Sequence, residues 1–291
     1  MSYVLAVDLG GTKTLMGLVD EAGVVAARRE IASAHTLTGT VAQLEDGLAG
    51  FGEPGIAGVG VIVPGIYDPA DGSAWAPNLW GEYFQPLREA LEERFSVPVA
   101  IGNDRTASVL AEEWVGRAQG MRDVVFVAVG TGIGVGILAG GQVVEGAHGI
   151  GGAAGWMVVG GRWKPEYAAR GGWETEAAGP GLARRAGRAT AEEVVAAARE
   201  GDQAALDAIG ETADLLALGI AGLIAMLDPE MVVLGGGLME AGDLMMERIR
   251  WKALAWTQPV AARRVRIERT ALGVEAGLLG AARLGWRRVE S

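Results

Sequence analysis

The sequence predicts a mixed α/β protein made of two related domains. Its 291 residues are enough for two domains of ordinary size, and half of them are apolar, enough to fill two cores. Two distant segments share one pattern, in which a strand, a glycine-rich turn and a second strand follow each other. A hairpin that occurs twice in this way indicates two domains of the same construction that face each other.

The two hairpins cover Tyr3–Asp20, with its turn at Gly10 and Gly11, and Val124–Ala139, with its turn at Gly130–Gly134. Each turn leads into a strand, whereas the glycine-rich turn of a Rossmann or P-loop site opens a helix. The Walker pattern that ends in Gly-Lys-Ser/Thr is also missing from the sequence. Neither of those nucleotide-binding motifs is therefore expected.

The other elements alternate between strands and helices along the chain. Expected strands lie at Ile56–Val63, Val97–Ile101, Met231–Leu234 and Arg264–Arg269, and expected helices at Leu87–Phe95, Arg105–Val115, Ala191–Arg199, Gln203–Met226, Leu244–Trp256 and Glu275–Leu284. The helix Gln203–Met226 stops before Pro229, because proline cannot continue a helix. Its apolar run, Leu215–Leu227, is shorter than the roughly 20 residues of a membrane span and indicates a buried helix.

The domain boundary is placed near Gly116–Asp123, between a helix and the second hairpin. The N-terminal domain then covers residues 1–117 together with the C-terminal helix 282–291, and the C-terminal domain covers residues 118–281.

Composition excludes several classes of function. A net charge of −11 argues against a nucleic-acid partner and against an anionic membrane surface, since both need clustered Lys and Arg. The absence of cysteine excludes disulfides, thiol catalysis and Cys-ligated zinc. No signal peptide is visible at the N-terminus. We expect a soluble, cytoplasmic protein that binds neither nucleic acid nor membrane.

The first glycine turn has the chemistry of a phosphate site. Backbone N–H groups of Gly10, Gly11 and Thr12 can approach phosphate oxygens closely, and Lys13 would add positive charge. Asp8 would hold Mg²⁺ through water, since hard cations prefer oxygen ligands. The alternative is a tight hairpin turn with no ligand.

The second and third glycine clusters extend this interpretation to a nucleotide. The second turn would hold phosphates through Gly130, Thr131, Gly132 and Gly134. In the third cluster an adenosine could lie against the backbone of Gly235, Gly236 and Gly237. The alternatives are a second hairpin turn and a simple strand terminator.

Asn103 and Asp104 lie between the end of a strand and the start of a helix. Either side chain could be the helix N-cap, a common use of both residue types. Asp104 could also be the general base that accepts the proton of an attacking hydroxyl, and the helix N-terminus would help to keep it ionised. The two roles are compatible with each other.

In their order and spacing these segments resemble the ROK (repressor, ORF, kinase) family of sugar kinases, in the hexokinase–actin–Hsp70 superfamily. The resemblance extends from Tyr3 to about Leu284. The matching motifs are Asp8-Leu-Gly-Gly-Thr-Lys13, Val63-Pro-Gly65, Ala76-Pro-Asn-Leu79, Gly102-Asn-Asp104, Gly130-Thr-Gly-Ile-Gly134, Gly146-Ala-His-Gly149, Leu227-Asp-Pro-Glu230 and Gly235-Gly-Gly237.

The resemblance implies two RNase H-like (actin/hexokinase-like) domains with an interdomain cleft, ATP and Mg²⁺ as cofactors, and Asp104 as the catalytic base. It implies phosphorylation of a small sugar or polyol, by default at the 6-hydroxyl of a hexose, and a possible homodimer. The residues it places near the sugar are Gly65, Asn78, Asn103, Asp104, His148, Trp156 and Glu174.

The chain departs from the family pattern in one region. Family members usually carry Gly-Glu-(Ile/Leu)-Gly-His where this sequence has Gly152–Trp156, so Ala153 replaces a glutamate and Trp156 a histidine. The segment Gly161–Trp173 replaces the cysteines of the usual zinc site. We therefore expect no zinc and a sugar pocket that differs from that of an ordinary glucokinase.

The altered pocket is expected to be more aromatic, with the alternative that Trp163 and Trp173 pack where the zinc loop would be. The tryptophans in question are Trp75, Trp80, Trp156, Trp163 and Trp173. Charged Arg162, Lys164 and Arg170 are expected to be solvated. Three functions remain open: a hexose kinase, a kinase for an amino sugar, cyclitol or glycoside, and a non-catalytic sugar or nucleotide sensor.

Overall fold

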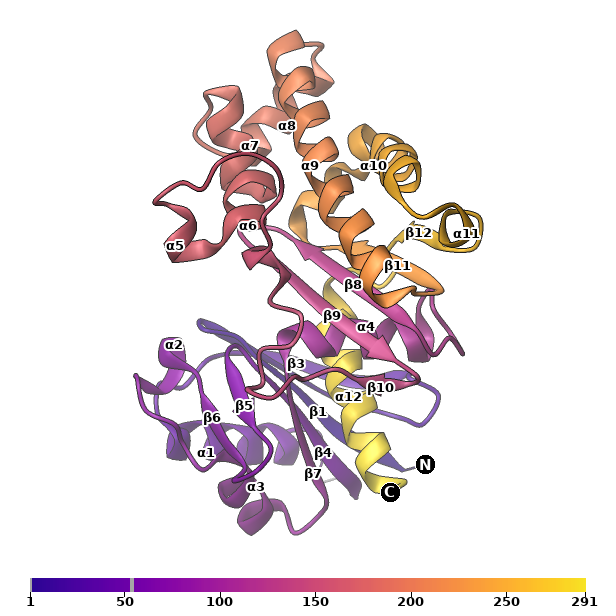
Figure 1. The fold of residues 1–291 in the computed structure, drawn as a ribbon. Coiled ribbons are helices and arrows are strands. Elements are labelled where there is room, and N and C mark those ends of the chain that lie inside the picture. The colour runs from indigo at the N-terminus through magenta and orange to yellow at the C-terminus, as the bar shows by residue number, and fades with distance from the viewer. Residues whose placement is uncertain (1, 53–54) are drawn as a thin grey trace. The chain divides into compact units, whose positions relative to one another are not determined.

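The computed structural model describes residues 2–52 and 55–291, which form two compact units (Figure 1). Unit 1 comprises Met1–Gly120, Glu145–Gly151 and Val274–Ser291, and unit 2 comprises Met121–Val144 and Gly152–Gly273. The sequence placed the return to the first domain at residue 282, inside the last helix. In the structure that helix is continuous, and all of it belongs to unit 1.

Unit 1 is built on a five-stranded sheet in the order β3-β2-β1-β4-β7. The strands are β1 (Tyr3–Leu9), β2 (Lys13–Val19), β3 (Val25–Ala32), β4 (Ile56–Val63) and β7 (Val99–Asn103). The first three strands pair antiparallel, whereas β1, β4 and β7 run parallel. The apolar run of β4 is almost wholly buried, as expected for a strand covered on both faces.

Helices cover both faces of this sheet (Figure 1). Unit 1 contains α1 (Leu37–Ala49), α2 (Pro77–Trp80), α3 (Leu87–Phe95), α4 (Asp104–Val115), α12 (Ala276–Val289) and the small hairpin of β5 (Ile66–Asp68) and β6 (Ser73–Trp75). Gly60 lets α12 lie directly on β4, because a Cβ at that position would lie 1.9 Å from the backbone oxygen of Ala281.

Unit 2 repeats the same sheet, in the order β10-β9-β8-β11-β12. The strands are β8 (Val124–Val129), β9 (Ile133–Ala139), β10 (Gln142–Val143), β11 (Met231–Gly235) and β12 (Arg266–Arg269). Here too the first three strands are antiparallel, and β8, β11 and β12 are parallel. The prediction of two related domains, each opened by a hairpin with a glycine-rich turn, is confirmed.

Unit 2 is rich in helices. They are η1 (Ala154–Trp156), α5 (Tyr167–Arg170), α6 (Gly172–Ala177), α7 (Gly179–Ala186), α8 (Ala191–Arg199), α9 (Gln203–Leu227), η2 (Gly237–Ala241), α10 (Gly242–Trp256) and α11 (Pro259–Ala262), with η3 (Gly273–Glu275) leading into α12. Of these, α6, α7, α8 and α10 pack on α9. Among the described residues α9 alone is long and apolar enough to cross a membrane, and 56% of its most apolar window is buried inside the protein. It belongs to the hydrophobic core of unit 2, so the prediction of a buried helix is confirmed.

Candidate active site

The turn between β1 and β2 is closed by its own backbone. The Gly10 N–H donates to the Lys13 oxygen at 2.9 Å, and the Ser33 hydroxyl donates to the Gly10 oxygen at 2.7 Å. Gly10 therefore shapes the turn, and a Cβ there would lie only 2.5 Å from the Lys13 oxygen. The N–H groups that the turn can offer to a phosphate are those of Gly11 and Thr12.

Lys13 was expected to add charge to this turn. In the structure its Nζ lies 2.5 Å from Glu30 Oε1 on the neighbouring strand, and both side chains are more than half exposed. An ion pair this exposed contributes little, about 0–1 kcal/mol, so a phosphate could compete with Glu30 for the lysine.

Asp8 and Asp104 form a pair of interacting carboxyl groups in unit 1. Asp8 is half-buried on β1, against the first turn of α12, where Gly277 leaves room for its carboxylate. Burial and, second, the negative charge of Asp104 raise the pKa of Asp8 to about 6. Burial also raises the pKa of Asp104, although the charge of Arg105 and backbone hydrogen bonds partly offset it. Two carboxylates that interact in this way could provide ligands for a cation and a proton acceptor.

The sequence allowed either Asn103 or Asp104 as the N-cap of α4, and in the structure the cap is Asn103. Its Oδ1 accepts a hydrogen bond from the Thr106 N–H at 3.1 Å, and the residue is buried. Asp104 is the first residue of α4, and its side chain reaches solvent. Because the cap does not need Asp104, its carboxylate remains available for chemistry.

The raised pKa of Asp8 predicts a dependence on pH. Protonation removes the negative charge that would hold a cation, so binding of a divalent cation at Asp8 should weaken as the pH falls through about 6. For stability the sign is opposite: ionised Asp8 is less favourable in the folded than in the unfolded protein, and this penalty is present at neutral pH and decreases as the pH falls from about 6 towards 3.8. Asp8→Asn should therefore raise the Tm at pH 7.5, as thermal unfolding would measure. A Tm equal to or below that of the wild type at this pH would contradict the raised pKa of Asp8.

Arg105 is a residue that sequence reasoning missed. Its guanidinium donates to the Gly149 oxygen at 3.1 Å and so ties the segment Glu145–Gly151 to α4. Its Nε is buried and makes no hydrogen bond to any residue that the structure describes. The only signal in the sequence was a cation directly after Asp104.

The other predicted sugar residues of unit 1 have different surroundings. Asn78, on α2, is exposed and lies beside the first glycine turn, its Cβ 3.5 Å from the place of a Cβ on Gly11. Glycine is required at position 65 for packing, because a Cβ there would lie 2.0 Å from the backbone oxygen of Trp75. His148 is exposed on the segment that Arg105 holds.

Unit 2 contains a pocket of about 910 Å³, a size typical of small-molecule sites. The second and third glycine clusters meet there, since Gly130, Thr131 and Gly237 all line it. The remaining walls come from the start of α7, from α8 and from η2. Their residues are Gly179, Pro180, Ala183, Ala189, Thr190, Ala191, Glu192, Val195, Ala196, Arg199, Leu238, Glu240 and Ala241.

The three residues of the third glycine cluster have different surroundings. Gly235 is buried, and a Cβ there would meet the ring of Phe126 at 2.4 Å. Gly236 has a φ of +88°, where glycine is strongly preferred. Gly237 faces open space in the pocket. Of the three, only Gly237 is placed to touch a ligand there.

The second turn is held by α7 and by Glu174. The Gly130 N–H donates to the Gly132 oxygen at 2.9 Å, and the Gly179 N–H donates to the Gly130 oxygen at 2.8 Å. Glu174 Oε2 accepts the Ile133 N–H at 2.9 Å. Glu174, predicted to lie near the sugar, thus contacts the turn predicted to hold phosphate, while Gly134 is the second residue of β9.

Two of the five tryptophans expected in an aromatic pocket are buried instead. Trp80 lies in the core of unit 1, and Trp173 lies fully buried in the core of unit 2, which confirms the alternative that Trp173 packs inside the protein. Trp163 is 67% exposed, which excludes the packing role expected for it. Trp75 donates from its indole N–H to the Glu82 oxygen. Trp156, on η1, is 57% exposed and remains a candidate for contact with a ligand.

In residues 2–52 and 55–291, no group of three or more His, Asp or Glu side chains is arranged to hold a metal ion. Asp8 and Asp104 provide two carboxylates, which fits a cation that keeps most of its waters, as Mg²⁺ does.

The sheet topology and the position of the glycine-rich turns define the structural class of the protein. A five-stranded sheet with three antiparallel and then parallel strands, present twice, is the RNase H-like architecture of actin and hexokinase. In each unit a glycine-rich turn joins the first two strands.

Comparison with known proteins identifies the family. The model of the ROK family matches residues 4–288, and the chain belongs to this family. A glucokinase of Halalkalibacterium halodurans is 30% identical, over 98% of this chain and 94% of the relative.

Two solved structures are similar over nearly the whole chain. A ROK family glucokinase from Streptomyces griseus, in complex with glucose and AMPPNP, is 29% identical with a TM-score of 0.77, covering 98% of this chain and 100% of that one. A putative N-acetylmannosamine kinase from Listeria monocytogenes is 27% identical with a TM-score of 0.79, covering 96% and 97%.

Proposed function

We propose that this protein is an ATP-dependent sugar kinase that transfers the γ-phosphoryl group of ATP to a hydroxyl of a hexose, by default the 6-hydroxyl. The observation that carries the proposal is the pairing of Asp104 with Asp8 in unit 1, which puts a solvent-accessible carboxylate beside a second carboxylate of raised pKa. The proposal is also supported by the similarity to the glucokinase of Halalkalibacterium halodurans and to the Streptomyces griseus glucokinase in complex with glucose and AMPPNP.

Asp104 acts as the general base. The sugar hydroxyl attacks the γ-phosphorus, its proton passes to the Asp104 carboxylate, and the bond from the γ-phosphorus to the β,γ-bridging oxygen breaks to release ADP. Asn103 fixes the start of α4 and so the position of the base. Ionised Asp104 is required, and Arg105 favours that form. Asn78, Asn103, His148, Trp156 and Glu174 are the proposed sugar contacts.

The nucleotide binds in the pocket of unit 2. Adenosine lies against Gly237 and the walls formed by α7 and α8, and the N–H groups of Thr131 and Gly132 donate to phosphate oxygens. In unit 1, Gly11 and Thr12 offer the equivalent donors. Asp8 would hold Mg²⁺ through water, and the ion would supply positive charge to neutralise the phosphates.

The acceptor is tested with a panel of sugars. Hexoses, N-acylated amino sugars, cyclitols and glycosides are each mixed with ATP and Mg²⁺, and ADP is measured by a coupled assay. We expect ADP formation to depend on the acceptor and to require Mg²⁺. A protein that binds sugar but forms ADP with none of the acceptors would be a sensor, and the kinase proposal would fail.

A second candidate is a kinase whose preferred acceptor is not glucose. It is favoured by Trp156, which presents an exposed indole where the family usually has histidine, and by Ala153, which has no carboxylate for sugar hydroxyls. The loss of charge-assisted hydrogen bonds to the sugar, about 1.5–3 kcal/mol each, would weaken glucose binding. In the same panel glucose should then be a poorer substrate than a sugar with a bulkier substituent. Glucose as clearly the best acceptor would reject this candidate.

A further inference from the structure

The short helix α6 carries two carboxylates with different partners. Glu174 accepts the Ile133 N–H at 2.9 Å, next to the Gly130–Gly132 turn, and a Cβ on Gly132 would lie 2.6 Å from Glu174 Oε2. Glu176 is two positions further on, roughly 200° around a helix of 3.6 residues per turn. The two side chains therefore leave α6 on opposite sides.

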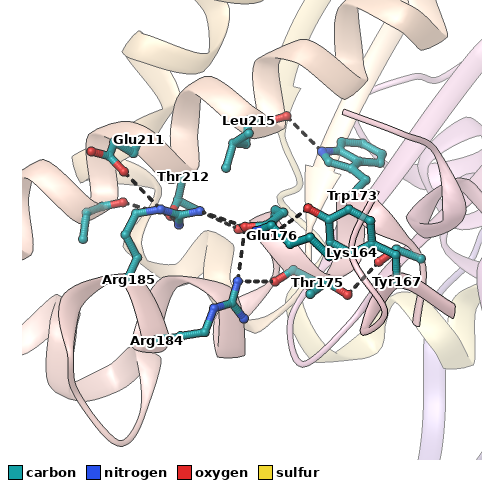
Figure 2. Close-up of polar contacts among 12 residues, drawn as sticks. Lys164, Tyr167, Trp173, Thr175, Glu176, Arg184, Arg185, Glu211, Thr212 and Leu215 are labelled. Atoms are coloured by element: carbon teal, nitrogen blue, oxygen red, sulfur yellow. Dashed lines mark hydrogen bonds and ion pairs between the residues drawn. The ribbon is translucent and has the colours of Figure 1, made fainter. Parts of the chain in front are cut away.

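Glu176 lies at the centre of a polar cluster (Figure 2). Its Oε1 accepts hydrogen bonds from Lys164 Nζ at 2.6 Å and from the Tyr167 hydroxyl at 2.7 Å. Its Oε2 accepts one from Arg184 at 3.2 Å. Arg185 donates to the backbone oxygen of Glu176 at 2.9 Å. One carboxylate thus joins α6 to the segment of α5 and to α7.

The charges of the cluster keep Glu176 ionised. Burial opposes ionisation, since the side chain is only 14% exposed, but hydrogen bonds from Lys164 and Tyr167 and the charges of Lys164 and Arg184 outweigh it and lower the pKa of Glu176. Arg185 also contacts Glu211 and Thr212, which connects the cluster to α9. A charge that is both shielded and paired on several sides holds its neighbours more firmly than a surface ion pair does.

The other end of α6 is anchored in the core. The indole N–H of Trp173 donates to the Leu215 oxygen on α9 at 3.0 Å (Figure 2). The ring fits because Gly219 has no side chain; a Cβ there would lie 2.2 Å from it. Glu174 lies between this anchor and the Glu176 cluster. The position of its carboxylate therefore depends on both contacts, because together they hold α6 in place.

The start of α6 also packs on the segment that carries Trp156. A Cβ on Gly171 would lie 2.3 Å from the backbone oxygen of Gly155. The backbone N–H of Trp173 donates to the backbone oxygen of Met157 at 2.9 Å. A shift of α6 would consequently move both Glu174 and the η1 segment.

We propose that Glu176 is a positioning residue for the sugar kinase reaction: with Lys164, Tyr167, Arg184 and Arg185 it fixes α6, and through α6 it holds the Glu174 carboxylate against the Ile133 N–H. The inference rests on the proposed function for its effect on catalysis. Its effect on the position of Glu174 does not depend on that function.

The test compares Glu176→Gln with a matched control, Asp214→Asn. Glu176→Gln keeps the size of the side chain and removes the charge. Asp214 is a comparable partly buried acceptor, bonded to Arg248 and Lys252 between α9 and α10, and among the residues that the structure describes it pairs with no side chain of α6. Both variants should lose stability to a similar extent, which separates a general loss of stability from an effect on the site.

The first readout is hydrogen exchange of the Ile133 amide in the free protein, which needs no activity. Glu176→Gln should lower its protection about 10-fold, the order expected when a buried charge-assisted network loses its centre, whereas Asp214→Asn should leave it unchanged. Tyr167→Phe removes one hydrogen bond and no charge, and should give a smaller fall in the same direction if Glu176→Gln proves too unstable to study. Unchanged Ile133 protection in both Glu176→Gln and Tyr167→Phe would overturn the inference.

The second readout is a double-mutant cycle with Glu174→Gln on kcat/KM for the acceptor. If Glu176 acts through Glu174, its substitution should lower kcat/KM about 10-fold in the wild-type background and leave it nearly unchanged when Glu174 is already Gln. Additive losses would overturn the catalytic part. If the wild type turned over no sugar, the proposed function would fail, and the Ile133 exchange would still decide whether Glu176 positions Glu174.

Discussion

Replacing Asp104 with alanine is expected to abolish sugar phosphorylation while the protein folds normally. A general base contributes about 10²–10⁴-fold to the rate, and a fall in kcat of at least 10³-fold is expected with little change in KM for ATP. Stability should change little, because the Asp104 side chain is exposed and the cap of α4 is Asn103. Steady-state kinetics and thermal unfolding measure the two effects.

Asn103→Ala is the natural companion to this variant. It removes the cap of α4, whose Oδ1 accepts the Thr106 N–H, and should cost about 1 kcal/mol of stability. The two neighbouring variants should thus differ in stability, since only Asn103→Ala removes the cap of α4. Wild-type turnover by Asp104→Ala would show that another group is the base.

Gly237→Val is expected to weaken ATP binding strongly without unfolding the protein. A Cβ added at this position would meet no atom outside the neighbouring residues within 4 Å, and Gly237 lines the pocket of unit 2. Added methyl groups in a fitted pocket change binding by about 10- to 200-fold, so the KM for ATP should rise by a factor in this range. The affinity for the sugar, measured without nucleotide, should be unchanged.

Gly236→Ala provides the contrast one residue earlier. Its φ of +88° strains any other residue, and the new Cβ would lie 2.5 Å from the Val129 oxygen. The Tm should fall for Gly236→Ala and remain near that of the wild type for Gly237→Val. If Gly237→Val bound ATP normally, the nucleotide would have to bind elsewhere.

Strong local patterns made much of the fold predictable. The aliphatic run Ile56–Val63 and the amphipathic segments Leu87–Phe95 and Ala191–Arg199 form elements with the bounds that the sequence indicated. The strand expected at Val97–Ile101 instead pairs from Val99 to Asn103, since Pro98 lacks the N–H that a ladder needs.

Weak patterns and long-range contacts account for what was missed. The strand β3 alternates too irregularly to stand out, because much of its surface is exposed. Helix α1 contains two glycines and two threonines, which are poor helix formers, and tertiary packing of Leu44 stabilises it instead. The last helix runs to Val289, five residues past its expected end at Leu284, because its apolar face continues through Trp286 into the core of unit 1.

The candidate site shows the same division between local and distant information. The glycine turns and the pair Asn103–Asp104 were visible as local motifs. The cluster around Glu176 was not, because Lys164 was expected to be solvated and its partner is 12 residues away. The burial of Trp173 was equally hidden, since it depends on Gly219, a position 46 residues further along the chain.

The most direct test of the account is a ³¹P NMR measurement of products from ATP, Mg²⁺ and the best acceptor of the panel. The account predicts one sugar phosphate for each ADP formed, with no inorganic phosphate above the level of a protein-free control. ADP that appears together with inorganic phosphate at the same rate with or without sugar would contradict it, because the γ-phosphoryl group would then be passing to water rather than to an alcohol held beside Asp104.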